Sequence, residues 1–306
     1  MMNIARSQRD KMKKDSGYLF VTFSGEGENG EEIYFSLSRD GLHWKDLNSG
    51  KSVLHSEIGE TGVRDPFLFE MVEKYYLIAT DLKIGSGTSW EDAAQKGSLS
   101  VIIWESKDLI HWSEERKCEI GSSDAGCVWA PEAVYDPKKE AAMVFWSSNI
   151  AGKYKIYRSY TKDFVTFTEA EVYMELEHDV IDMTIWREKD TFYRFYKNEE
   201  NKTICVDRGQ ELDGEFQMIY SEFLHNLKGV EGPIVFRLRD RKLCLMVDQF
   251  QINGGYLPVI CKDLDEGLFY QMKQGEYCLG NICKRHGSIM EISDKTYLEL
   301  EKYYKA

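Results

Sequence analysis

Short apolar runs separated by polar turns repeat along most of the chain. Each copy has an apolar run, an aromatic run, an alternating run, and an aromatic residue after a short polar spacer. Four such copies follow one another: PFLFE, YYLIATD, LSVIIWESKD; EAVYD, AAMVFWSSN, YKIYRSYTKD; DMTIW, TFYRFYKNE, KTICVDRG; and PIVFRL, KLCLMVDQ, YLPVICKD. Four strands per roughly 50–70 residues is typical of a β-propeller blade. A single four-stranded sheet has two apolar faces, and radial packing against copies of itself buries both.

The two chain ends together supply a fifth copy. YLFVTFS, EEIYFSLS and LHW provide three strands without a leading one, and GSIMEIS at residues 287–293 provides the missing strand. We therefore predict an all-β, five-bladed β-propeller whose ring is closed by pairing of the N- and C-terminal segments, which removes exposed strand edges. Residues 1–306 would form a single catalytic domain, with peripheral tails at 1–16 and 294–306. A two-sheet sandwich is the alternative fold, but it would need no such repeat.

The middle of the chain is almost free of helical periodicity, which excludes Rossmann and α/β-barrel folds. In a propeller, the innermost strand of each blade lines a central channel, so the starts of these strands converge at one end of the axis. The predicted inner strands open with acidic residues, namely Asp65 in GVRDPFLFE, Glu132 in WAPEAVYD, Asp182 in HDVIDMTIW and Glu231 in GVEGPIVF. We expect these four acids at about the same place in successive blades.

One acidic residue in a turn is usually only solvated. A cluster of carboxylates is different, because like charges raise one another's pKa, a cost tolerated mainly for chemistry or for a cation. Three interpretations remain open at this point. The acids could cage a calcium ion, they could supply the carboxyl pair of a glycosidase, or each could merely cap its own turn.

The motifs RDPFLF, WAPE, VIDMTIW and VEGPIVF, in this order, resemble those of glycoside hydrolase family 43, from about Tyr18 to the segment KRHGSIMEIS. The resemblance implies a five-bladed propeller acting on arabinofuranosides and β-xylosides by an inverting mechanism. It further implies that Asp65 is the general base, that Asp182 modulates the pKa of the acid and orients it, and that Glu231 is the general acid. Met183 departs from the pattern, since the family usually has proline there.

The residues around these acids suggest how each would be tuned. Arg64 precedes Asp65 and would keep it ionised, and it is also expected to bind substrate. Val230 and the apolar run after Glu231 would raise the pKa of Glu231, and the negative charge of Asp182 would act in the same direction. An inverting enzyme would hold its base and acid roughly 6.5–9.5 Å apart.

Further residues are expected at the pocket. Trp90 lies at the centre of the long polar segment KIGSGTSWEDAAQKGS and could form a wall. Trp129 could stack on a sugar face or fill the core between blades. Glu132 could accept a sugar hydroxyl, lie behind the pocket or be structural. Arg285 and His286 precede the closing strand, where Arg285 could pair with the acids and His286 could stand beside a channel cation.

Composition narrows the classes of partner. The net charge of −13 disfavours nucleic acid and anionic membranes as partners. No run of ~18 apolar residues is present, and the N-terminus is charged without a signal-peptide core. The seven scattered cysteines fit a reduced, cytoplasmic protein. GEGENG at residues 25–30 is expected to be a hairpin loop. No cofactor is required by this chemistry, although a structural calcium or sodium ion could occupy the channel.

The resulting hypothesis is an exo-acting inverting glycosidase that removes terminal α-L-arabinofuranosyl or β-D-xylosyl residues from hemicellulose-derived oligosaccharides. Its partners would be small arabinoxylan or xylan fragments. Two alternatives stay open. One is a propeller that binds glycans without cleaving them. The other is a five-bladed enzyme acting on fructosides, whose retaining mechanism would bring the two carboxyls to about 5 Å.

Overall fold

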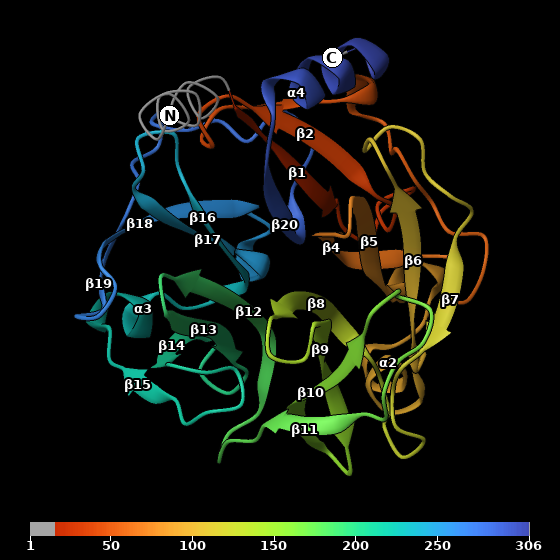
Figure 1. Cartoon of the computed structure of the whole chain (residues 1–306), viewed down its shortest axis with the longest axis vertical. Coiled ribbons are helices and arrows are strands. Elements are labelled where there is room, and N and C mark those ends of the chain that lie inside the picture. The colour runs from red at the N-terminus through yellow and green to blue at the C-terminus, as the bar shows by residue number, and fades with distance from the viewer. Residues whose placement is uncertain (1–15, 306) are drawn as a thin grey trace.

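The computed structural model describes residues 16–305, whose strands form five four-stranded antiparallel sheets arranged in a ring (Figure 1). The sequence-based prediction of a five-bladed propeller is confirmed. Of the tail expected at residues 1–16, all but Ser16 lies outside the described residues.

Each blade runs outward from an innermost strand at the channel. The blade that joins the chain ends contains β20 (Arg285–Ile292), β1 (Gly17–Phe23), β2 (Tyr34–Ser38) and β3 (Trp44–Asp46). The second contains β4 (Val63–Met71), β5 (Lys74–Asp81), β6 (Ser100–Ser106) and β7 (Arg116–Glu119). The third contains β8 (Trp129–Asp136), β9 (Ala141–Ile150), β10 (Lys153–Thr161) and β11 (Glu171–Met174). The fourth contains β12 (Val180–Glu188), β13 (Thr191–Asn198), β14 (Thr203–Gly209) and β15 (Gln217–Ile219). The fifth contains β16 (Glu231–Arg237), β17 (Leu243–Asp248), β18 (Tyr256–Asp263) and β19 (Leu268–Gln271).

The ring closes as predicted. β1 pairs with β20 along its whole length, with Leu19 opposite Met290 and Gly17 opposite Ile292. The last strand of the chain is therefore the innermost strand of the first blade. This pairing ties the two chain ends together through a ladder of backbone hydrogen bonds.

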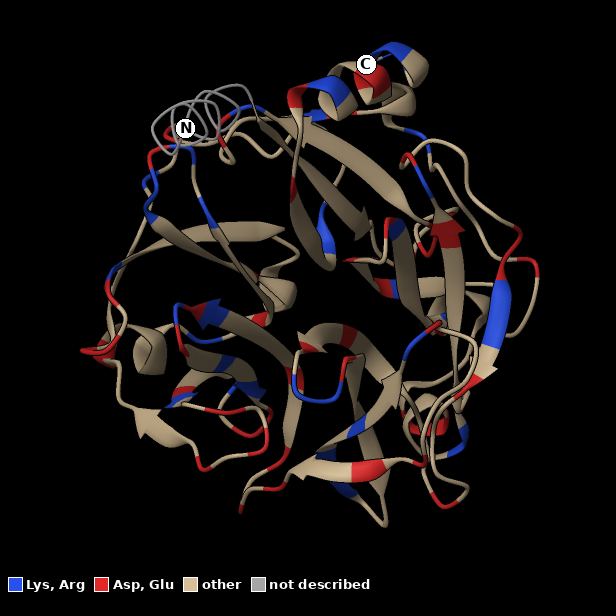
Figure 2. Ribbon diagram, in the orientation of Figure 1, with Lys and Arg blue, Asp and Glu red and all other residues tan. Residues whose placement is uncertain are grey.

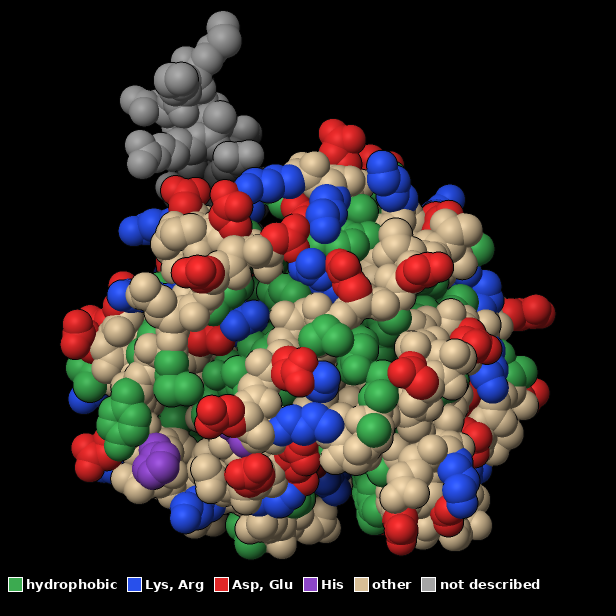
Figure 3. All heavy atoms as spheres, turned by 90° about the horizontal axis from the view of Figure 1, so that it is seen from below, with side chains coloured by type: hydrophobic (Ala, Val, Ile, Leu, Met, Phe, Trp, Pro, Cys, Tyr) green, Lys and Arg blue, Asp and Glu red, His purple; other side chains and the backbone are tan. Residues whose placement is uncertain are grey.

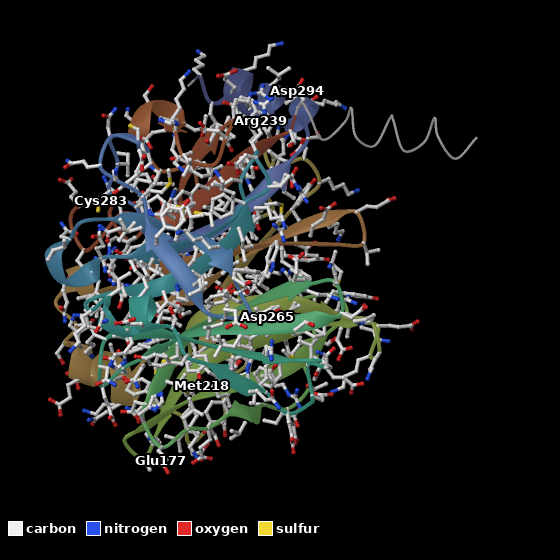
Figure 4. All side chains as sticks on the ribbon, turned by 90° about the vertical axis from the view of Figure 1, so that its left-hand side faces the viewer. Glu177, Met218, Arg239, Asp265, Cys283 and Asp294 are labelled. Atoms are coloured by element: carbon white, nitrogen blue, oxygen red, sulfur yellow. The ribbon has the colours of Figure 1, made fainter. Side chains whose placement is uncertain are left out.

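The segment after the closing strand forms a helix, α4 (Asp294–Tyr303), which Ser293 caps through its side chain. Tyr297 and Leu300 of this helix are buried in the apolar cluster between the first and second blades. At its start, Asp294, which is labelled in Figure 4, pairs with Arg39 at 2.6 Å. Burial of two large side chains, at roughly 1.5–3 kcal/mol each, is enough to hold such a helix against the blade.

The repeated Asp-containing segments are matching turns between the third and fourth strands. In the first blade, the Ser38 hydroxyl accepts a hydrogen bond from the amide of Gly41 at 2.9 Å. Asp40 accepts from the amides of Leu42 and His43 at 2.8 Å each. The same bonds recur at Ser106 and Asp108 and at Thr161 and Asp163. These side chains satisfy backbone donors that the turn leaves unpaired, which explains why the motif repeats in the sequence.

The remaining helices are short. The polar segment around Trp90 is partly helical, with α2 (Trp90–Lys96) capped by Ser89, and α3 (Glu222–Asn226) precedes β16. Among the described residues, no helix has the length and apolar character needed to cross a bilayer. The outer surface seen in Figure 3 mixes acidic and basic side chains.

Candidate active site

The inner strands β4, β8, β12 and β16 all begin with a β-bulge. Their pairing with the second strand of the blade shifts register at the same point in each case. The residue inside each bulge has left-handed backbone geometry: Asp65 (φ 51°), Ala130 (φ 49°), Asp182 (φ 53°) and Gly232 (φ 51°). Such geometry costs about 1–3 kcal/mol for a residue other than glycine, and it clusters at functional sites.

The bulges correct one sequence-based expectation, because the four acids do not occupy equivalent positions. Asp65 and Asp182 are the bulge residues, whereas Glu231 stands one residue before its bulge. Glu132 follows its bulge by two residues, at the position that Thr184 occupies in the next blade. Only Asp65 and Asp182 are true equivalents. All four acids nevertheless lie within the first four residues of their inner strands, and Figure 2 shows acidic segments of the ribbon around the central channel.

Glu132 lies below the site rather than in it. It is 5 % exposed and is not among the residues that line the pocket. Burial raises its pKa well above the usual value, although a hydrogen bond with Thr184 acts in the opposite direction. The structure therefore favours an interior role for Glu132 over the expected contact with a sugar hydroxyl.

The other predicted residues do meet in one place. A cavity of about 700 Å³ opens at the end of the channel where the inner strands begin. Three carboxyls, those of Asp65, Asp182 and Glu231, line it. Its walls also contain the other predicted residues Arg64, Trp90, Trp129, Arg285 and His286.

Asp65 is held by its neighbours in two blades. The Thr80 hydroxyl donates a hydrogen bond to its Oδ2 at 2.8 Å, and the same Thr80 oxygen accepts one from the amide of Ala130 at 2.9 Å. Nδ1 of His286 lies 3.5 Å from the other carboxylate oxygen. Asp65 is thus fixed in orientation while it remains open to the cavity.

Asp182 is more enclosed. Its Oδ2 accepts a hydrogen bond from the amide of Gly232 at 3.2 Å and lies 3.8 Å from His286 Nδ1. A Cβ at position 232 would meet the His286 ring at 2.7 Å, so glycine is needed there for space as well as for its φ. Burial raises the pKa of Asp182 to about 6; nearby His286 lowers it and Glu231 raises it.

Glu231 differs from the expectation. Burial alone would raise its pKa, but two cations outweigh burial and the pKa is lowered. Lys197 Nζ donates to Oε2 at 2.8 Å, and Arg285 Nη2 donates to Oε1 at 3.2 Å. Sequence reasoning missed Lys197.

Lys197 belongs to a pattern that the pairing register reveals. In four of the five blades, the second-strand residue paired with the residue just before the bulge reaches the inner strand of the next blade. Ser147 accepts from the amide of Asp182 at 3.1 Å, and Asp248 accepts from the amide of His286 at 3.1 Å. Thr80, described above, reaches Ala130 and Lys197 reaches Glu231. The signal was present in the sequence, since a polar residue ends each apolar second run: IATD, FWSS, FYKN and MVD.

Arg64 does not serve Asp65 as expected. Its Nη1 atom lies 3.0 Å from Glu31 and 3.4 Å from Glu26, and these are its ion pairs. The guanidinium packs over the Trp90 ring, 4.9 Å from the centroid. The β1–β2 hairpin that carries Glu26, the predicted GEGENG loop, therefore forms part of the pocket wall, a role that the sequence did not suggest.

A family model described as a probable glycosyl hydrolase domain, of the family 43-related type, matches residues 14–298. The chain belongs to glycoside hydrolase family 43. The resemblance found in the sequence motifs is thereby confirmed.

This family 43 chain is similar to an α-L-arabinofuranosidase of Bifidobacterium longum subsp. longum, with 30 % identity over 247 residues. The match covers 69 % of the chain but only 23 % of that relative. Among solved structures, an exo-1,5-α-L-arabinanase from a bovine ruminal metagenomic library has a TM-score of 0.59 at 15 % identity, covering 85 % of this chain and 93 % of that one. A thermostable family 43 glycoside hydrolase has a TM-score of 0.54 at 17 % identity, covering 79 % and 83 %. At these identities the two structures support the fold alone.

The family 43 site has the groups needed for acid–base chemistry. Within residues 16–305, no group of three or more His, Cys, Asp and Glu side chains is arranged to hold a metal ion. His286 Nδ1 instead faces the Asp65 and Asp182 carboxylates at 3.5 and 3.8 Å. The channel ion considered from the sequence stays a prediction.

Proposed function

We propose that this chain is an exo-acting inverting glycosidase that releases terminal α-L-arabinofuranosyl residues, and β-D-xylosyl residues as the second candidate, from hemicellulose-derived oligosaccharides. The observation that carries the proposal is the meeting of Asp65, Asp182 and Glu231 in one cavity at the channel end. Family membership and the arabinofuranosidase relative support the preference for arabinofuranosides.

Asp65 is proposed as the general base. It would take a proton from the water that attacks the anomeric carbon. The hydrogen bond from Thr80 leaves Asp65 Oδ1 facing His286, so one oxygen is anchored while the carboxylate faces the cavity. A fixed base in contact with its water typically contributes 10²–10⁴-fold to rate.

Glu231 is proposed as the general acid. Its proton would go to the leaving-group oxygen as the glycosidic C–O bond breaks. In the free protein Lys197 and Arg285 favour its ionised form, so substrate must enter a site in which the acid is protonated for only part of the time. Asp182, bonded to the amide of Gly232, would position the Glu231 segment and add the negative charge that promotes protonation.

The cavity suits a small sugar. Its volume of about 700 Å³ is in the range of sites that enclose one small ligand, and two tryptophans 6.0 Å apart form an aromatic corner. Trp90 and Trp129 could pack against the apolar face of a ring. The proposed reaction is carried entirely by protein carboxyls and water, and the substrates would be short arabinoxylan or xylan fragments.

The test is hydrolysis of a panel of aryl glycosides by the purified chain, with the product followed by NMR. We expect turnover of an aryl α-L-arabinofuranoside, more slowly of a β-D-xyloside, and initial release of the sugar with inverted anomeric configuration. Initial release with retained configuration would favour the fructosidase-like mechanism. Binding of arabinose without turnover of any substrate would favour the glycan-binding alternative and overturn the proposal.

A further inference from the structure

Lys197 lies between two carboxylates. Its Nζ atom is 2.8 Å from Glu231 Oε2 and 2.8 Å from Glu199 Oε2. The Lys197 side chain is 3 % exposed, whereas Glu199, just beyond the end of β13, is 26 % exposed and lines the cavity wall. Glu199 also pairs with Lys202 through its other oxygen. Glu199 thus contacts Lys197, the cation that pairs with Glu231, from the solvent side of the pocket.

The proposed reaction creates an electrostatic problem at this point. Glu231 must be neutral before it can donate a proton, and neutral Glu231 no longer balances the ammonium of Lys197. A buried cation without a partner is strongly unfavourable. Burial would lower the pKa of Lys197, but Glu231, Asp182 and Glu199 outweigh burial and raise it, so the lysine stays charged.

Resting on the proposed function, we propose that Glu199 is a positioning residue that retains Lys197 whenever Glu231 takes up its proton. Lys197 then needs to move little during turnover. Its contact with Glu199 persists, and its contact with Glu231 weakens on protonation and strengthens again as the proton passes to the leaving group. Glu199 therefore sets how easily the acid is protonated without touching the reacting atoms.

The other charged groups around Glu231 fit this interpretation. Glu231 is faced by charged groups from four neighbouring strands: Lys197 of β13, Asp182 of β12, Asp248 of β17, and Arg285 and His286 of β20. Arg285 repeats the arrangement of Lys197, since its Nε donates to Asp248 at 2.7 Å while its Nη2 donates to Glu231. Each cation that holds the acid thus has a second carboxylate. Asp248 is fully buried, so Glu199 is the one that can be changed with least risk to folding.

The test compares Glu199→Gln with Glu200→Gln, the same change at the exposed neighbouring residue. Each variant is assayed with two aryl pentosides that the wild type hydrolyses. One has a phenol leaving group that needs a proton, and the other has a dinitrophenol leaving group that does not. Without Glu199, Lys197 should hold Glu231 ionised more strongly. We expect Glu199→Gln to lower kcat/KM for the phenyl substrate about tenfold on the alkaline side of its optimum.

The same variant should change kcat/KM for the dinitrophenyl substrate by less than about twofold, and Glu200→Gln should leave both substrates unchanged. Equal slowing of both substrates by Glu199→Gln would overturn the inference, because it would indicate lost structure or a direct sugar contact. An unchanged phenyl profile would overturn it as well. A wild type that hydrolyses neither substrate would instead remove the proposed function on which the inference rests.

Discussion

Two partly buried carboxylates in this propeller, Asp46 and Glu231, are both paired with lysines and yet have opposite surroundings. Asp46 ends β3, where its Oδ1 accepts from Lys284 Nζ at 2.6 Å and its Oδ2 from the amides of Asn281 and Ile282 at 2.7 and 3.0 Å. A fourth donor, Ser36, completes the set at 2.9 Å. Burial would raise the pKa of Asp46, but Lys284 and the two amides lower it. This carboxylate is fixed in its ionised form.

Glu231 has cations on both oxygens but also acids around it. Asp182 and Asp248, both with pKa values raised to about 6 mainly by burial, lie nearby, and its side chain faces the cavity at 18 % exposure. Lys197 and Arg285 lower the pKa of Glu231, while burial opposes them, and nearby negative charge acts in the same direction as burial. The comparison teaches that a fully satisfied buried ion pair serves as structure, whereas a pair crowded by like charges is suited to chemistry.

The largest expected effect comes from Glu231→Gln, which should reduce activity strongly while leaving stability nearly unchanged. Glutamine keeps the shape of the side chain but cannot donate the proton, so kcat for an aryl glycoside with a poor leaving group should fall about 10³-fold. Lys197 and Arg285 keep Glu199 and Asp248 as partners, so the unfolding midpoint in urea should stay close to that of the wild type. A variant that unfolds early would show that Glu231 is needed mainly for structure.

Asp46→Asn should have the opposite pattern, with a large loss of stability and little change in kcat. It leaves Lys284, which is 1 % exposed, as a buried cation without its carboxylate, at a cost of about 3–5 kcal/mol in the free energy of unfolding. Because Lys284 immediately precedes the closing strand, this loss should loosen ring closure, while kcat of the folded fraction stays near the wild-type value. Urea unfolding measures the first effect and active-site titration the second.

The matched control for Asp46 is the double variant Asp46→Asn with Lys284→Met. Removal of the cation should restore a large part of the stability lost in the single variant, because no buried charge then lacks a partner. If the double variant is as unstable as the single one, the backbone hydrogen bonds to Asp46, rather than the ion pair, stabilise this blade.

Much of the fold could be read from the sequence because a blade is a local unit. The spacing of apolar runs and the Asp-containing turns belong to one blade each, and the segment at residues 287–293 had only one place left in the ring. Asp65, Asp182 and Glu231 were found in the same way, as acids at the starts of inner strands.

What could not be read depends on register and on contacts between blades. A one-residue bulge decides that Asp182 faces the cavity while Glu132 lies below it, and spacing alone does not reveal a bulge. Lys197 sits in the run TFYRFYKNE and acts on the next blade, at Glu231, so no local pattern indicates its partner. The lowered pKa of Glu231 was missed for that reason.

The smallest expected effect is on how the free energy of unfolding depends on pH. The pKa of Asp182 is raised to about 6 in the folded protein, mainly by burial, so folding favours its protonated form. Wild-type stability therefore gains a contribution as pH falls from about 6 toward 4, and that contribution is lost as pH rises through the folded pKa. Asp182→Asn lacks it, so its free energy of unfolding relative to the wild type should increase, on the order of 1–3 kcal/mol, between pH 4 and pH 7.

Asp46→Asn is the matched comparison in the same experiment, because the pKa of Asp46 is shifted in the opposite direction from that of Asp182. The pKa of Asp46 is lowered, so the stability that its ionised form contributes is fully present above the unfolded pKa of about 4 and is lost only as pH falls below it. Urea unfolding of both variants and the wild type at pH 3.5, 4, 5, 6 and 7 should show a difference that changes between pH 4 and 6 for Asp182 and stays level there for Asp46. If the stability differences of the two variants from the wild type follow parallel curves against pH, Asp182 is held in one charge state over this range as firmly as Asp46 is.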